Sequence, residues 1–316
     1  MRPKASFAVV PLLLVMALVG CGGDSNSDDT ASGDKPAAAN SPEVKKLIRQ
    51  TFGPNKNATS GKLSGTIDIK VEGARSYREP VQVTLSGPFN QSGSGTAEAN
   101  LSVGLQLRGG AIGGELILID DKMLIGLGSS AYTIPPNIAE PIRRPLAKKS
   151  NGLQSVLGVF GVAPQRWAKN PRLVGDARIA GEDTIHGTAE INTRTFFLDV
   201  AKLAKVLTSL RITEIVGIPT EVDRQARSAL VRSVTSAKGD VYTGADDKVL
   251  RQAQFDIQLK PSSKDRQILG FSSLSLKGQL NVTEVGTPQK IEAPKVAGTF
   301  DDLQETFDAL AAGVKE

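Results

Sequence analysis

The chain has 316 residues, of which 40% are hydrophobic and 22% are charged, as in ordinary soluble globular domains. The chain has one cysteine and one histidine, which excludes internal disulfides and metal sites built from several such ligands. Any Cys-His dyad would have to use that one cysteine. The formal net charge is +5. The chain has no basic run and only 4% aromatic residues, so we expect no nucleic-acid partner.

The first 20 residues have the pattern of an export signal. Arg2 and Lys4 form a short positive region, and Phe7–Leu18 form an apolar stretch too short to span a bilayer permanently. This stretch runs into Leu18-Val19-Gly20-Cys21, which resembles the bacterial lipobox. The resemblance implies cleavage before Cys21 and a diacylglycerol, with acyl chains such as palmitate, on its sulfur. We therefore expect a lipid-anchored protein on the extracytoplasmic face of the cell membrane.

Residues 21–41 are predicted to be the lipidated cysteine and a flexible tether. After Cys21 the segment consists mainly of Gly, Ser, Asp, Asn and Ala without an apolar pattern. Taking away the two cations of the leader and the net negative charge of this tether leaves a charge of +6 on residues 42–316. The third segment, 42–316, is predicted to be a single folded domain. Its mild basicity fits either a solvated surface or attraction to anionic lipid headgroups.

The folded part begins with a predicted helix, capped by Ser41, started by Pro42 and stopped at Gly53-Pro54. Apolar and polar residues then alternate with the period of antiparallel strands that have one wet face. These predicted strands are 63–71, 81–85, 99–107, 116–119, 123–127 and 130–134. Asp120-Asp121 is the turn expected between the fourth and fifth of them. Gly113-Gly114 is expected to be a turn or a bulge.

The second part of the chain mixes helices and strands. Helices are predicted at 138–148, 198–210, 221–236 and 300–314, the last one beginning at Asp301-Asp302. Strands are predicted at 173–180, 184–191, 239–242, 249–259 and 274–283. The apolar run Leu153–Val162 is either a lid over an entrance or an ordinary buried helix. The predicted fold class is α+β: a curved, mostly antiparallel sheet with helices on one face.

No catalytic constellation is recognisable in the sequence. His186 lies inside a strand pattern, where a histidine is usually structural, and no G-x-S-x-G elbow accompanies it. We therefore predict that the chain is not an enzyme, and that it uses no cofactor and binds no metal. A surface hydrolase that depends on His186 is the weakest alternative.

Several local features resemble the actinobacterial LprG/LppX lipoprotein family. They are the leader, the amphipathic first helix, the Ser86-Gly87-Pro88 strand end, Trp167, and the segment Gly181–Gly187 that leads into a strand. This resemblance implies a LolA-like half-barrel, in which the sheet wraps around helices and leaves an apolar cavity for acyl chains. It also implies a carrier that passes a lipid or glycolipid through the cell envelope, with an envelope transporter as a possible partner.

A cavity of this kind needs a sheet face of aliphatic residues that helices do not fill completely. The predicted ligand-binding residues are Ile67, Ile69, Val83, Leu85, Leu101, Val103, Phe255 and Ile257. Each of them is equally consistent with a plain hydrophobic core. The alternative function is therefore an anchored, non-catalytic structural or interaction protein whose core is filled.

Overall fold

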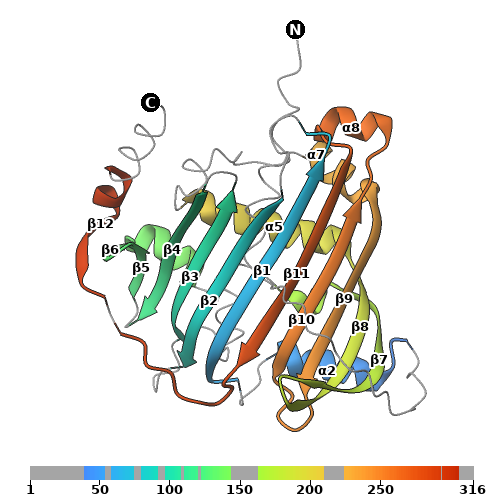
Figure 1. Ribbon diagram of the computed structural model, residues 1–316, viewed down its shortest axis with the longest axis horizontal. Helices are drawn as coiled ribbons and strands as arrows, with labels where there is room; N and C mark the ends of the chain where they lie inside the picture. The colour runs from blue at the N-terminus through green and yellow to red at the C-terminus, as the bar shows by residue number, and fades with distance from the viewer. Residues whose placement is uncertain are drawn as a thin grey trace.

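The computed structural model describes residues 39–53, 58–74, 80–91, 97–107, 110–119, 122–143, 163–209, 224–292 and 294–305 (Figure 1). The predicted signal peptide 1–20, Cys21, most of the tether and the run Leu153–Val162 lie outside these ranges.

The described residues form one open sheet of 12 strands, in the spatial order β12-β6-β5-β4-β3-β2-β1-β11-β10-β9-β8-β7 (Figure 1). Neighbouring strands are antiparallel except for the parallel pair β12–β6. The predicted α+β fold with a mostly antiparallel sheet is confirmed. The strands are β1 Ser60–Glu72, β2 Val81–Gln91, β3 Ala97–Leu107, β4 Gly110–Ile119, β5 Lys122–Leu127, β6 Ser130–Thr133, β7 Ala168–Ile179, β8 Glu182–Ile191, β9 Val234–Gly244, β10 Leu250–Leu259, β11 Ser273–Thr283 and β12 Val296–Thr299.

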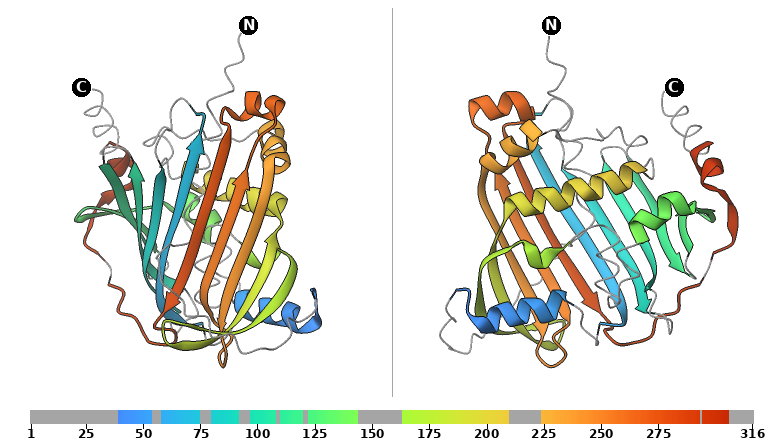
Figure 2. Two further views of the ribbon diagram at one scale, coloured as in Figure 1. Left: turned by 45° about the vertical axis from the view of Figure 1, so that its right-hand side comes forward. Right: turned by 180° about the vertical axis from the view of Figure 1, so that it is seen from behind.

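Helices cross one face of this curved sheet, which we call the inner face (Figure 2). The helices seen against it are α2 Pro42–Phe52, α3 Pro136–Arg143, the short 3-10 helix η1 Pro164–Arg166, and α5 Thr193–Ser209. Two more, α7 Arg224–Ser233 and α8 Ser263–Leu269, lie at one end of the strands, and residues 300–305 are also helical. No helix in the described ranges is long and apolar enough to cross a membrane.

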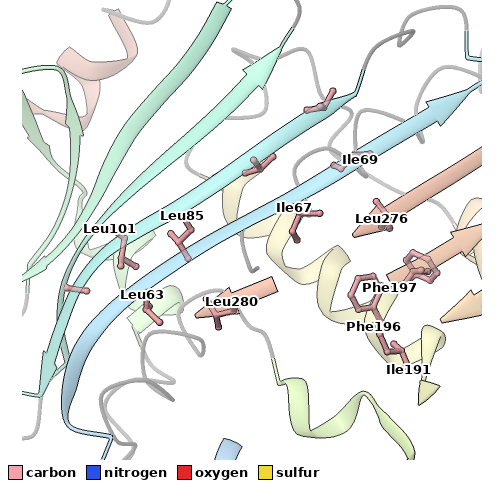
Figure 3. Packing of buried hydrophobic residues seen from close by; sticks show 14 of the residues in the cluster. Leu63, Ile67, Ile69, Leu85, Leu101, Ile191, Phe196, Phe197, Leu276 and Leu280 are labelled. Atoms are coloured by element: carbon pink, nitrogen blue, oxygen red, sulfur yellow. The ribbon is translucent and has the colours of Figure 1, made fainter. Parts of the chain in front are cut away.

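Strand β1 shows why the sheet has an inner and an outer face. Leu63, Ile67, Ile69 and Val71 are buried, whereas Lys62, Asp68, Lys70 and Glu72, at the alternating positions, are exposed. Successive side chains of a strand point to opposite faces, so this period-2 pattern places one row against the helices and the other in water. The inner row joins residues of β2, β3 and β11 and two phenylalanines of α5 in one hydrophobic cluster (Figure 3).

Some boundaries differ from the predictions. The helix predicted at 221–236 ends at Ser233, and Val234 already begins β9, where it pairs with Leu259. Val234 and Thr235 are both β-branched, which favours a strand over a helix. The structure extends the strand predicted at 81–85 through Gly87-Pro88 to Gln91. Gly87 has a φ of 147°, and a Cβ there would lie 1.9 Å from the Asn100 carbonyl oxygen, so only glycine fits.

One predicted turn was wrong, and one helix was not predicted. Gly113 and Gly114 are neither a turn nor a bulge, because both pair in regular register with β3 inside β4. Helix α8 was not predicted, although its end signals are in the sequence. The Ser262 side chain accepts a hydrogen bond from the backbone N–H of Asp265, and Gly270 ends the helix in the left-handed conformation.

The C-terminal segment passes from β11 to the far edge of the sheet (Figure 2). On this path the backbone N–H of Gln289 donates to Asn90 Oδ1 at 2.9 Å, and the Asn90 amide donates back to the Gln289 carbonyl. The segment then adds β12 beside β6 and starts the last helix. Thr299 and Asp302 cap this helix reciprocally, in agreement with the predicted start at Asp301-Asp302.

Candidate functional site

An apolar cavity of about 100 Å³ lies between α2, η1 and the inner face of strands β7 to β11. Most of the lining surface is apolar, and Thr188, Asp240 and Gln254 are also among the lining residues. The α2 residues in it are Val44, Leu47, Ile48, Thr51 and Phe52, and the segment around η1 contributes Pro164, Trp167 and Ala168. The sheet contributes Gly187, Ala189, Ile191, Gly239, Val241, Thr243, Ala253, Phe255 and Leu280, and Pro171, Arg172 and Glu190 come from the ends of β7 and β8.

Small side chains on the inner face create this space. Gly187, Ala189, Gly239 and Ala253 occupy inner positions on β8, β9 and β10, whereas most inner positions of β1 and β2 carry Ile, Leu or Val. A Cβ built on Gly187 meets no atom closer than 3.6 Å, and one on Gly239 none closer than 3.4 Å. Both glycines therefore leave room above the sheet that larger side chains would occupy.

Two aromatic residues of the lining, Trp167 and Phe255, are joined through Phe196, which is not itself a lining residue. The Trp167 and Phe196 rings meet edge to face with centroids 5.0 Å apart, and Phe196 meets Phe255 in the same way at 5.7 Å. Gly278 lies directly under the Phe255 ring, since a Cβ at that position would be 2.7 Å from the ring and 2.8 Å from Ile67. The glycine thus lets Phe255 lie across β11 and reach the aromatic cluster.

The carboxylate of Asp199, buried on α5, holds η1 and Trp167 in place. It accepts hydrogen bonds from Trp167 Nε1 at 3.1 Å, Arg166 at 3.1 Å, Lys202 at 2.7 Å and the backbone N–H of Ala163 at 3.3 Å. Asp199 is fully buried, whereas the side chains of Arg166 and Lys202 are half exposed. Charged hydrogen bonds of this kind compensate the cost of burying the carboxylate.

Helix α2 closes the cavity from the other side and is held at both of its ends. Near its C-terminus, Thr51 Oγ1 lies 2.8 Å from Thr243 Oγ1 of β9, and both side chains are buried. Before its N-terminus, the backbone N–H of Asn40 donates to the Pro171 carbonyl of β7 at 2.9 Å. The helix is therefore fixed across the ends of β7 to β9 by polar contacts at both termini.

Most of the eight predicted ligand-binding residues lie away from this cavity. Phe255 lines it. The other seven are buried in the main cluster or packed partly buried against it, and none of them belongs to the cavity lining (Figure 3). These seven are Ile67, Ile69, Val83, Leu85, Leu101, Val103 and Ile257. Their role as ligand contacts remains a prediction.

His186 has a structural environment on the outer face of β8. Its Nε2 lies 2.9 Å from Asp240 Oδ1, and its ring stacks on Tyr242 with centroids 4.4 Å apart. Burial of Asp240 raises the pKa of its carboxyl, but hydrogen bonds from His186 and Thr188 and nearby positive charge outweigh burial, and the net pKa is lowered. Within the described ranges, no three His, Cys, Asp or Glu residues are grouped as a metal site requires.

Sequence reasoning missed the part of the lining that comes from α2 and from the small inner residues. A signal for it existed: Gly and Ala occupy several inner positions of the C-terminal strands, whereas most inner positions of the N-terminal strands carry branched aliphatic residues. Gly187, Ala189, Gly239 and Ala253 all follow that pattern.

No family model and no curated protein matches the chain. Among solved structures, it is similar to LprF from Mycobacterium bovis, at 13% identity over 82% of this chain and 99% of that one, with a TM-score of 0.42. It is also similar to the lipoprotein LppX of Mycobacterium tuberculosis, at 15% identity over 79% of this chain and 99% of that one, with a TM-score of 0.39.

A LolA superfamily protein from Nitrosomonas europaea matches at 10% identity over 79% of this chain and 96% of that one, with a TM-score of 0.22. The matched structures thus include LppX, one of the two proteins that give the LprG/LppX family its name. At these identities and TM-scores, the matches carry no conclusion about what the chain binds or does.

Proposed function

We propose that this chain is a lipoprotein that binds an acyl chain of a lipid or glycolipid in the cavity under α2 and carries that lipid in the cell envelope. The observation that supports the proposal is the apolar cavity itself, with small residues on its floor and the aromatic residues Trp167 and Phe255 in its lining. Each CH₂ group moved from water into apolar surroundings contributes about 0.8 kcal/mol to the free energy of binding. Even a short segment of acyl chain would therefore bind favourably in the cavity.

The cavity dimensions indicate how much of a lipid it takes up. Sites for drug-sized ligands usually measure about 300–1,000 Å³, whereas this cavity measures about 100 Å³. We therefore propose that it receives a segment of one acyl chain. The polar parts of the lipid would remain near Arg172 and Glu190, at the ends of β7 and β8.

Anchoring is the second part of the proposal. It rests on the leader and on Cys21, the only cysteine of the chain. Full-length protein expressed in a bacterial host should fractionate with membranes and carry a diacylglycerol mass on its N-terminal cysteine. Cys21→Ala should abolish that mass and leave the uncut leader in place.

Lipid binding is tested with residues 22–316, which contain every described strand and helix. Native mass spectrometry of this protein from a lipid-containing host should show bound lipid. A titration with tail-brominated fatty acid should quench the fluorescence of Trp167, the single tryptophan, which lines the cavity.

The matched variants are Gly187→Leu and Ser86→Leu. Gly187→Leu places a side chain in the cavity, and we expect it to abolish both signals. Ser86→Leu adds the same side chain at an exposed position of β2 and should leave both signals unchanged. Apo protein in every preparation, with no quenching of Trp167, would instead identify the chain as an anchored interaction protein with a filled core.

A further inference from the structure

The tether enters the fold beside the cavity. Asn40 is joined to the edge strand β7 by its backbone bond to Pro171 and by a side-chain bond to Asn170 Oδ1 at 3.3 Å. Pro171 and Arg172 are both lining residues of the cavity. The point where the predicted tether ends is therefore also an edge of the proposed lipid site.

The predicted tether would limit the distance of the domain from the membrane but leave its orientation free. Residues 22–39 separate Cys21 from Asn40, and about 18 residues of this composition have an r.m.s. span of roughly 25 Å. Since that span is comparable to the radius of a domain, either end of the sheet can approach the bilayer. A second contact is needed to turn the cavity toward the lipid.

The exposed face of α2 has the chemistry for this contact. Val44, Leu47 and Thr51 are buried against the sheet, which leaves Lys45, Lys46 and Arg49 exposed on the opposite face. No carboxylate in the described part of the chain pairs with these three cations. Glu43 is the one acidic residue of the helix, so α2 carries a net charge of +2.

The neighbouring end of β7 extends this basic surface. Lys169 is neutralised by Glu190 at 2.8 Å, but Arg172 adds an exposed cation beside the cavity. Anionic phospholipid headgroups attract clustered Lys and Arg side chains near a membrane surface. Each such cation raises the binding constant for the membrane about fivefold.

We infer that the exposed face of α2, together with Arg172, docks on the anionic phospholipid surface of the membrane and holds the mouth of the cavity at the headgroups. This inference rests on the proposed anchored carrier, and it adds the surface and the lipid charge that orient it. Lys45, Lys46 and Arg49 are the contacts that determine the orientation, and the tether keeps them within reach of the bilayer.

The test uses residues 22–316 and vesicle flotation, so binding is measured without the lipid anchor. The vesicles are phosphatidylcholine alone or phosphatidylcholine with phosphatidylglycerol. Binding is expected only to the anionic vesicles and should weaken as salt is raised. Lys45→Gln/Lys46→Gln/Arg49→Gln should weaken it on the order of 100-fold.

The matched control removes three exposed cations from the other end of the sheet, Lys260→Gln/Lys264→Gln/Arg266→Gln, next to or on α8 (Figure 1). It changes the net charge equally and should bind like the parent. Equal loss in both variants would show that only total charge matters, and unchanged binding of the α2 variant would overturn the proposed surface. Equal binding of the parent to both kinds of vesicle would also overturn it.

Trp167 reports the orientation directly. Energy transfer from Trp167 to dansyl-labelled headgroups should be strong in the parent and the α8 control and weak in the α2 variant, with circular dichroism confirming that all three are folded. Lipid uptake is measured separately, by Trp167 quenching that persists after vesicles are removed. Docking without lipid uptake would refute the carrier function and support the docking surface. Lipid uptake without energy transfer would support the carrier function and refute the docking surface.

Discussion

The two halves of the inner face differ in how their side chains use the space above the sheet. On β1, β2 and β3 most inner positions hold branched aliphatic residues, and Ile69 and Leu101 are completely buried. On β8, β9 and β10 the corresponding positions hold Gly187, Gly239 and Ala253, and the cavity lies over them. A single sheet thus combines a filled aliphatic core with a hollow region.

Apolar character alone therefore does not locate a binding cavity in a curved sheet. In the aliphatic half, packing between large side chains closes the space. In the hollow half, polar contacts of Asp199 and Thr51 hold α5, η1 and α2 above small residues. Stability should therefore come from side-chain volume in one half and from hydrogen bonds in the other.

The largest expected effect is in the aliphatic half. Leu101→Ala removes a fully buried side chain from a packed cluster, and we expect the free energy of unfolding to fall by about 3–4 kcal/mol. Urea denaturation measures this change. A loss below about 1 kcal/mol would indicate that the half we describe as filled has room to relax.

Asp199→Ala should have the next largest effect, and in the hollow half. The change leaves Trp167 Nε1 and the Ala163 N–H without their acceptor, while the half-exposed Arg166 and Lys202 can turn to water. We expect a loss of about 2–3 kcal/mol, accompanied by a red shift of Trp167 emission. Loss of stability with unchanged emission would contradict its role in positioning Trp167.

Two glycines of the inner face should respond in opposite directions. Gly278→Ala forces a Cβ against Phe255 and Ile67 and should cost about 1–3 kcal/mol. Gly187→Ala meets only ordinary contacts and should stabilise the fold by about 0.5 kcal/mol, because alanine restricts the unfolded chain. Thermal unfolding of both variants checks this, and similar losses in both would show that Gly187 has no free space above it.

The smallest effect concerns acid stability on the outer face of the hollow half. The pKa of Asp240 is lowered from its ordinary 3.8 in the folded state, so its stabilising contribution is present at neutral pH and is lost as the pH falls below about 3.8. Asp240→Asn should therefore be less stable than the parent at pH 7, and the two should converge in acid. A stability difference that is the same at both pH values would argue against this pKa shift.

Much of the fold could be predicted from the sequence because it depends on local patterns. The alternation in β1, the Ser41 cap of α2 and the antiparallel pairing of β4 with β5 were predicted correctly. The end of α7 was placed wrongly because Val234 fits both a helix periodicity and a strand, and only the pairing with Leu259 decides between them.

The candidate site was harder to predict, since it is a space left by small side chains. Phe255 was recognised as a large inner residue, but Gly187 and Gly239 carry no side chain that would mark a site. Their importance depends on α2 lying above them, and that placement depends on contacts between residues far apart in the chain, such as Thr51 with Thr243. No pattern within either segment contains that information.

The register at the centre of the sheet has a consequence for the order of folding. Lys62 of β1 pairs with Thr283 of β11, so the two middle strands come from nearly opposite ends of the described chain. The meanders β1 to β6 and β7 to β11 pair with their sequence neighbours and can form early, but their junction must wait until residues 273–283 are available. A chain that emerges from its N-terminus onward therefore stays divided into two incomplete sheets until β11 joins them.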